Sequence, residues 1–267
     1  MPEALTIGHY VPGDSPVHRL DSRVKLLLTM AYVVVLFFAA RPAAYAALLL
    51  LPLAGYLLAR MPLGMVWQGL RPVAFVLLLT VVLNALMTPG HPLYRLGRVA
   101  VTAEGLRLGL EMAVRLILLM VTSTLLTLTT SPIELTDGLE SLLRPFRRVG
   151  VPAHELAMMM TIALRFIPTL LEEAQNILKA QQARGADFES GNLLRRARAM
   201  VPLLVPLFVG AFRRADELAT AMEARCYHGG EGRTRYREYR IGRADWVAAG
   251  VTTAALLFVL LDRLLGV

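Results

Sequence analysis

The sequence predicts an all-α integral membrane protein with about five transmembrane helices and a cytoplasmic block of three helices, two of them long. Three observations predict this architecture. Hydrophobic residues make up 56% of the 267 residues and charged residues 18%, whereas soluble domains average about 45–50% and about 25%. The apolar residues gather in charge-free runs, most of which approach the roughly 17–25 residues that cross a bilayer. A long charged section rich in Leu, Met and Ala separates the fourth run from the fifth.

The five charge-free runs are the candidate spans. The first and last are slightly short, and flanking side chains such as Lys25 and Arg263 lengthen them by reaching the headgroups. Buried core helices of a soluble protein are a poor alternative, because these runs leave no polar face for water. Gly105-x-x-x-Gly109 favours close helix packing. The runs are Leu26–Ala40, Pro42–Ala59, Pro72–Tyr94, Leu116–Ile133 and Trp246–Leu261.

Basic residues indicate the orientation of the chain in the membrane. Arg19, Arg23 and Lys25 precede the first span and favour a cytoplasmic N-terminus. The loop around Arg95–Arg107 then falls outside, against the rule. The net charge of +8 and the basic segment Arg233–Arg243 indicate contact with anionic lipid rather than nucleic acid. We therefore expect a multi-pass protein with four spans in 1–130, a cytoplasmic helical domain in 131–243 and a last span in 244–267.

The cytoplasmic section carries clear helix signals. Ser131-Pro132-Ile133-Glu134 has the pattern of a capping box with proline at the first helical position, and its helix should run to about Arg148. A second helix should span Ala153–Arg184 with a kink at Pro168. A third should begin at Asn192, after a linker at Asp187–Asn192, and end at Arg225, interrupted by two prolines.

Two of these helices end in similar arginine motifs. Ala183-Arg184-Gly185 closes the second helix and Ala224-Arg225-Cys226 closes the third. A cation on the last helical turn is stabilised by about 0.3–1 kcal/mol. The small neighbours leave the guanidinium free to project, and its five donors suit a pocket of carboxylates or carbonyl oxygens on another protein. The alternative is that each arginine serves only as a favourable C-terminal charge.

A methionine-rich segment in the second helix forms a candidate contact face for a partner. Methionine side chains are flexible and repack easily, so such faces suit partners that exchange. Packing between the helices of the block itself is an equally good interpretation. The residues are Met158, Met159, Met160, Leu164 and Ile167.

Signals for chemistry are missing from the sequence. There is no P-loop, so we expect no ATP binding by the chain itself, no catalytic residues and no cofactor. His154-Glu155 begins like a zinc-protease motif, but position 158 is methionine, so the second ligand is missing and no metal site is expected. The single cysteine excludes an internal disulfide.

Four stretches together resemble one known family. They are Tyr10–Leu26, Ser131–Glu140, Leu164–Leu171 running on to Gly185, and Met222–Arg225 with His228–Arg233. The chain resembles the EcfT (CbiQ/EcfT) family, the transmembrane subunits of energy-coupling factor transporters, which are ABC-type importers of vitamins and metal ions in the bacterial cell membrane. The similarity covers essentially the whole length.

The resemblance implies a role for each motif. The cytoplasmic helices would be coupling helices, and Arg184 and Arg225 would each dock on one of two ATPase subunits. A separate substrate-binding membrane subunit, interchangeable in the shared type, would take the cargo, with vitamins favoured over a dedicated cobalt or nickel system. The sequence departs from the family at Cys226, where a glycine or another small residue is usual. A left-handed helix stop there is therefore doubtful, because a side chain is unfavourable at positive φ.

Two other classes remain as alternatives. An integral membrane enzyme would place its site in the cytoplasmic block and use Glu172, Glu173 and His154. A standalone secondary transporter would need broken helices or charges at mid-membrane, and the apolar runs show neither.

Overall fold

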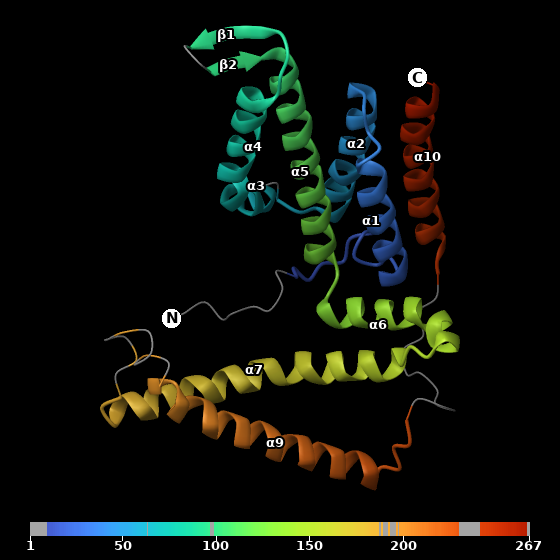
Figure 1. The fold of residues 1–267 in the computed structure, drawn as a ribbon. Helices are drawn as coiled ribbons and strands as arrows, with labels where there is room; N and C mark the ends of the chain where they lie inside the picture. The colour runs from blue at the N-terminus through green and yellow to red at the C-terminus, as the bar shows by residue number, and fades with distance from the viewer. Residues whose placement is uncertain are drawn as a thin grey trace. The chain divides into compact units, whose positions relative to one another are not determined.

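The computed structural model describes residues 10–62, 64–96, 99–186, 188, 192, 196, 198–229 and 241–265. Helices dominate these residues, as predicted for an all-α membrane protein, and a single two-stranded hairpin interrupts them (Figure 1). The chain divides into two compact units, Met1–Leu139 with Glu238–Val267, and Glu140–Arg237. The first unit holds the charge-free runs and the second holds the two long charged helices.

The core of the first unit lies among four helices. α1 (Ser22–Leu36), α2 (Pro42–Ala59), α5 (Ala103–Thr129) and α10 (Arg243–Leu265) pack side by side, and the last of them contacts both α1 and α2. The Tyr32 hydroxyl donates to the Leu48 carbonyl at 2.8 Å, which satisfies a polar group inside an apolar core. The most deeply buried side chains include Leu36, Leu48, Tyr56, Leu118 and Val259.

α4 (Ala74–Met87) packs against the first half of α5 through glycines. A Cβ at Gly109 would lie 2.9 Å from Cα of Val81, and one at Gly105 would overlap the Asn84 carbonyl oxygen. The absence of side chains therefore lets the two backbones approach closely. The predicted packing role of Gly105 and Gly109 is confirmed.

The third predicted span differs from the structure at both ends. A short helix α3 (Gly64–Leu70) and a 3-10 turn (Arg71–Val73) precede α4, which ends at Met87 rather than at Tyr94. The segment that follows forms β1 (Pro92–Leu96), paired antiparallel with β2 (Val99–Thr102). The run carries no Asp, Glu, Lys or Arg, but Pro89-Gly90 ends the helix because proline cannot donate to the helical ladder.

The helix that contains the fourth predicted span begins well before Leu116. α5 begins at Ala103, because the Thr102 side chain caps the helix and accepts from the Gly105 N–H at 3.2 Å. Charged residues in the added turns pair along the helix, with Arg107 Nε 2.9 Å from Glu111 Oε1. A charge-free run therefore marked only the apolar part of a longer helix.

Among the described residues, four helices are long and apolar enough to cross a membrane: α2, α5, α7 (Ala153–Ala183) and α10. α1, with 15 residues, and the Arg71–Met87 segment are shorter than this limit. α7 was expected in the cytoplasmic block. Its later half carries Glu172 and Glu173, and charges inside a bilayer cost about 2.5–3.5 kcal/mol each, so composition alone does not make it a span.

The helices of the second half begin and end largely as predicted. α6 (Pro132–Leu143) opens with the expected capping box, in which the Glu134 N–H donates to Ser131 Oγ at 3.2 Å and the Ser131 N–H to Glu134 Oε2 at 3.4 Å. A 3-10 turn (Arg144–Val149) follows, ending at Gly150 with φ +90°. α7 then continues through Pro168.

The described residues agree with a helical start at Asn192. The Arg196 N–H donates to the Asn192 carbonyl at 3.0 Å, Arg198 and Ala199 are helical, and a turn at Met200 separates them from α9 (Val201–Ala224), which runs unbroken through Pro206. Pro202 lies in the first turn of α9. The N–H groups of a first turn have no partner within the helix, so a proline there costs no hydrogen bond. Residues Arg233–Arg240 of the predicted lipid-contacting segment, and most of the predicted Asp187–Asn192 linker, lie outside the described residues.

Candidate functional site: two arginine-bearing helix ends

Arg184 occupies the end of α7. Gly185 follows it with φ +85°. The Gly185 N–H donates to the Gln182 carbonyl at 2.9 Å, and the Ala186 N–H donates to the Gln181 carbonyl at 3.0 Å. These two bonds are those of a Schellman motif, which satisfies carbonyls that the helix leaves free. The direction in which the chain leaves Arg184 is therefore fixed.

Arg225 ends α9 in the same way. The Cys226 N–H donates to the Glu223 carbonyl at 2.9 Å, and the Tyr227 N–H donates to the Met222 carbonyl at 3.0 Å. Cys226 has φ +57°, the left-handed conformation. The left-handed helix stop that the cysteine made doubtful is therefore present. A side chain there costs roughly 1–2 kcal/mol, and two backbone hydrogen bonds of about 0.5–1.5 kcal/mol each offset that cost.

Both arginine side chains are available to a partner. Arg184 and Arg225 are exposed, and neither forms an ion pair with another described residue. The small residues on either side, Ala183 with Gly185 and Ala224 with Cys226, are also exposed. Each guanidinium can therefore enter a recess on another protein without first breaking an ion pair to a described residue.

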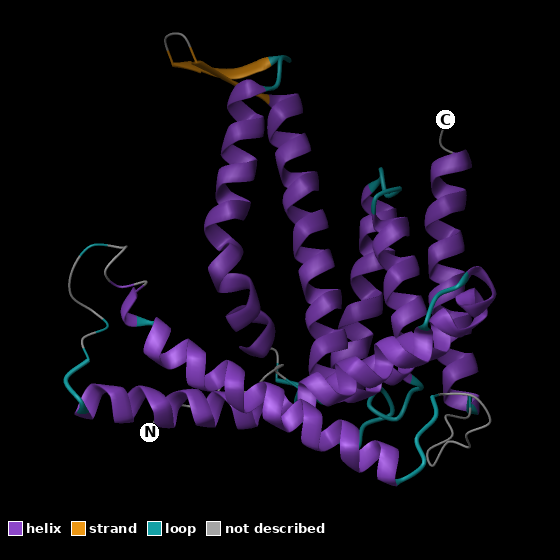
Figure 2. Ribbon diagram, turned by 60° about the horizontal axis from the view of Figure 1, so that its bottom comes forward, coloured by secondary structure: helices purple, strands orange, loops and turns teal. Residues whose placement is uncertain are grey.

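The two arginines lie at opposite ends of a helix pair. α7 and α9 run antiparallel, as the labels and colours of Figure 1 show, and they cross in the view of Figure 2. At 1.5 Å per residue, α7 is about 46 Å long and α9 about 36 Å. The pair thus presents one arginine at each end rather than a single cluster.

Polar contacts hold the two helices together in the last third of α7. Arg214 of α9 lies 2.8 Å from Glu173 of α7, measured from Nη2 to Oε2, with both side chains about one-third exposed or less. A Cβ at Gly210 would lie 2.8 Å from Glu173 Oε1, so the glycine leaves room for the carboxylate. Nearer the Arg184 end, Gln181 Nε2 approaches the Pro202 carbonyl oxygen at 3.5 Å.

Toward the Arg225 end an apolar cleft separates the helices. Its volume is about 420 Å³. Nearly all of its lining is aliphatic or aromatic, contributed chiefly by Ile162, Phe166, Leu170, Leu218 and Met222. The helices are thus joined by polar contacts on one side of the crossing and leave an unfilled apolar space on the other.

Comparisons with known proteins identify the family. The model of the CbiQ family, described as a cobalt transport protein, matches residues 13–236. The energy-coupling factor transporter transmembrane protein EcfT of Acidaminococcus fermentans is 54% identical over 96% of this chain and 95% of its own length. Those of Thermosediminibacter oceani and Bacillus subtilis are 57% and 48% identical, over 94% and 97% of this chain and 95% and 99% of their own lengths. The chain belongs to the CbiQ/EcfT family. It is a transmembrane component of an energy-coupling factor transporter in the bacterial cell membrane.

In this EcfT-family chain the methionine-rich segment wraps around α7. At 100° per residue, Met160, Leu164 and Ile167 share one face, whereas Met158 and Met159 point to other sides. Met159 and Met160 are 54% and 45% exposed, and the other three are half-buried. Met159 lies on the side that carries Ile162 and Phe166 of the cleft. The predicted contact residues are therefore spread around the helix and do not form a single face.

The residues named for an enzymatic alternative do not converge. His154 Nδ1 lies 3.3 Å from Glu140 Oε1, and Glu173 is paired with Arg214. His154 and Glu173 stand on one helix about 28 Å apart along its axis. No group of three metal-binding side chains occurs among the described residues. The EcfT proteins that this chain resembles are transport components rather than catalytic enzymes.

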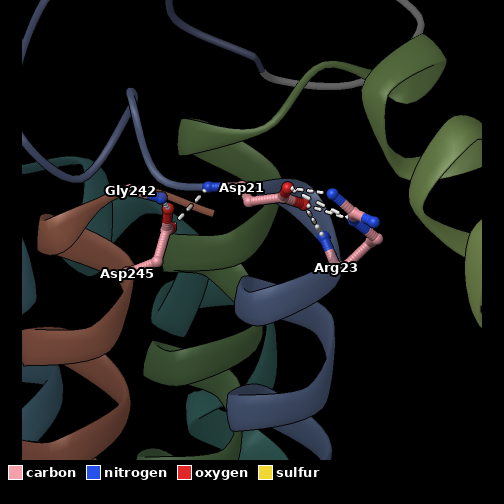
Figure 3. Close-up of polar contacts among 4 residues, drawn as sticks. All are labelled: Asp21, Arg23, Gly242 and Asp245. Carbon is pink, nitrogen blue, oxygen red and sulfur yellow. Dashed lines mark hydrogen bonds and ion pairs between the residues drawn. The ribbon is translucent and has the colours of Figure 1, made fainter. Parts of the chain in front are cut away.

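Sequence reasoning missed a buried polar junction in the first unit. Asp245, at the start of α10, accepts from the Asp21 N–H and the Gly242 N–H, each at 2.8 Å (Figure 3). Asp21 in turn caps α1 and binds Arg23, with Nη2 2.6 Å from Oδ2. Burial by itself would raise the pKa of Asp21, but hydrogen bonds and charge from Arg23 and the charge of Lys25 bring it below its usual value.

Lys25 completes this junction. It is buried, and its Nζ donates to the Thr129 carbonyl at 2.9 Å and to the His18 carbonyl and Thr130 Oγ1 at 3.2 Å each. Burial lowers the pKa of Lys25 to about 8, although nearby carboxylates oppose the shift. The sequence had indicated only a flanking cation. Thr129 and Thr130 could not be identified as partners there, because they lie about a hundred residues away.

Proposed function

We propose that the chain is the non-catalytic coupling subunit of an ATP-driven, ABC-type micronutrient importer. In this proposal Arg184 and Arg225 each bind one ATPase subunit, and a separate membrane subunit holds the substrate. The observation that carries the proposal is the equivalence of the two helix ends. Both have the same hydrogen-bonded stop, an exposed guanidinium and small neighbours.

The placement of the arginines suits two copies of one partner. One guanidinium at each end of a crossed helix pair offers two similar contacts that are well separated. The five donors of arginine match carboxylate and carbonyl oxygens in a recess, and lysine would not reproduce their fork. A charge-assisted bond of this kind contributes about 1.5–3 kcal/mol. The family name supports an assembly with further subunits.

The helix pair also offers a way to transmit motion. When ATP draws the two ATPase subunits together or releases them, the ends of α7 and α9 move with their arginines. The Glu173–Arg214 contact then acts as the pivot, and the apolar cleft beyond it changes width. The cleft and the faces that carry Met158, Met159, Met160, Leu164 and Ile167 contact the substrate-binding subunit in this proposal.

The cargo belongs to the other membrane subunit. We favour vitamins, as the resemblance of the sequence to the shared type of EcfT subunit implies; a dedicated cobalt or nickel system is the alternative, and the description of the matching family model names cobalt. Uptake of labelled vitamins and of labelled cobalt by cells that express the full transporter, with and without this chain, distinguishes the two. The N-terminus is cytoplasmic in both cases.

Charge reversal at the two helix ends tests the docking proposal. Arg184→Glu and Arg225→Glu, singly and together, should weaken co-purification with the ATPase subunits tenfold or more and abolish ATP-driven uptake when combined. Arg165→Glu and Arg213→Glu are matched controls, since both arginines are exposed on the same two helices but away from their ends. Complex formation and uptake that survive the double substitution would overturn the proposal.

A further inference from the structure

A cavity lies among the helices of the membrane unit. Its volume is about 440 Å³, and α1, α2, α5, α10 and the N-terminal segment 16–20 all contribute to its walls. Aliphatic side chains form most of the surface, among them Leu28, Leu51, Leu125 and Val251. Gly55 belongs to the wall as well, and a side chain there would collide with Leu125.

The cavity opens where the membrane lies. Leu58 of α2 and Val247 and Val251 of α10 line it and are 56%, 65% and 59% exposed. α2 and α10 are both long and apolar enough to cross a bilayer. The mouth of the cavity therefore faces hydrocarbon chains rather than water.

The charged group that lines the cavity already has hydrogen-bond partners in the protein. Lys25 is the one charged residue of the lining, and its amine donates to three oxygens of the protein. Thr129 Oγ1 donates to the Leu125 carbonyl at 2.7 Å. An occupant consequently meets an apolar surface and finds no free cation within.

Two basic side chains adjoin the lining from outside. Arg19 precedes Leu20 and its side chain is 72% exposed, with Asp14 at 4.0 Å as a distant partner that is itself 98% exposed. Arg243 precedes Ala244, is exposed, and forms no ion pair with another described residue. Such residues at the edge of a bilayer attract anionic headgroups.

We propose that this cavity binds one acyl chain of an anionic bilayer phospholipid, with the headgroup held outside near Arg19 and Arg243. The volume falls in the range of small-ligand sites. A helix with its side chains is 10–12 Å across and rises 5.4 Å per turn, so the cavity would hold only about one turn of a partner helix. A single acyl chain is thinner than a helix and can enter this volume from the bilayer. The phosphate of the same lipid then remains in the headgroup layer.

Photo-crosslinking tests the proposal on the full-length chain in nanodiscs. The probe is phosphatidylglycerol with a diazirine on one acyl chain, and the labelled peptides are located by mass spectrometry. We expect labelling around Leu125 and Ala248 to exceed that at Leu79, an exposed α4 residue outside the cavity. Ala248→Phe should reduce the cavity labelling at least tenfold, and Ala249→Phe, the neighbouring α10 position outside the lining, should leave it unchanged.

The headgroup is tested with two further probes. Phosphatidylcholine and a free fatty acid carrying the same diazirine chain should label the cavity several-fold less than phosphatidylglycerol, and the Arg19→Gln/Arg243→Gln variant should remove that preference. Thermal scans of Ala248→Phe confirm that a lost label is not lost folding. Equal labelling of the cavity and Leu79, insensitivity to Ala248→Phe in a folded protein, or equal labelling by all three probes would each overturn the assignment.

Discussion

Cys226 has the left-handed backbone conformation, which glycine adopts more easily. Gly185 has the same conformation at the other arginine-bearing helix end, so substitutions at the two positions can be compared. Replacing Cys226 by glycine should stabilise the end of α9. Replacing Gly185, which has φ +85°, by alanine should destabilise the end of α7. Both changes leave the arginine itself and the rest of its helix intact.

The magnitude follows from two opposing effects. Removing a Cβ from the left-handed region relieves roughly 1–2 kcal/mol. A new glycine also gives the unfolded chain more freedom, which costs about 0.4–1 kcal/mol. The net gain for Cys226→Gly is therefore about 0.5–1 kcal/mol, and Gly185→Ala should lose a similar amount. Because 1.4 kcal/mol is a factor of ten, each local opening equilibrium changes about two- to five-fold.

Hydrogen exchange at the two helix ends measures this directly. The amides to follow are those of positions 185, 186, 226 and 227, which donate the Schellman bonds. Exchange at 226 and 227 should slow two- to five-fold in Cys226→Gly, and exchange at 185 and 186 should accelerate equally in Gly185→Ala. Cys226→Ala keeps the Cβ and removes the thiol, so its exchange should match the wild type.

Two outcomes would refute the reasoning. If Cys226→Ala slows exchange as much as Cys226→Gly, the thiol rather than the backbone conformation sets the stability of this end. If Cys226→Gly changes nothing while Gly185→Ala accelerates exchange, the two ends are not equivalent in solution, and the argument from their common geometry is lost.

Three further predictions concern the membrane unit. Gly109→Val should destabilise the protein by about 1–3 kcal/mol in thermal scans by separating α4 from α5, whereas Gly250→Ala, in open space on α10, should be neutral or stabilising. Lys25→Met should cost about 1–3 kcal/mol, because buried carbonyls lose their donor. Since the folded pKa of Lys25, about 8, lies below the ordinary 10.5, the unfolded state binds more protons between these values. The stability of the wild type relative to Lys25→Met should therefore rise as pH increases from about 8 to 10.5, and scans across that range would show a constant difference if the pKa is not lowered.

Local patterns predicted most of the helices. The capping box at Ser131 and the glycine after Arg184 were identified correctly, because a cap depends on residues within one turn. Composition failed where a helix continued past its apolar part, as at the start of α5, or stopped within an apolar run, as at Met87. A charge-free run indicates which part of a helix is apolar enough for the bilayer core. The residues at which the helix begins and ends depend instead on its hydrogen-bonded caps.

The two arginine-bearing helix ends were also predicted only in part. The sequence predicted that Arg184 and Arg225 end helices, and the structure confirms both helix ends. The left-handed conformation of Cys226 was not predictable from residue preference, because the cost of its side chain is outweighed only when both Schellman bonds form.

By itself the sequence determined the membrane class, the family and the two arginine-bearing helix ends, since each depends on composition or on residues close together in the chain. The tertiary structure alone decided that the arginines stand at opposite ends of a crossed pair, that Glu173 meets Arg214, and that Asp245 binds the backbone at Asp21. These contacts join residues far apart in sequence. Whether they form depends on how whole helices pack, and no local preference encodes that.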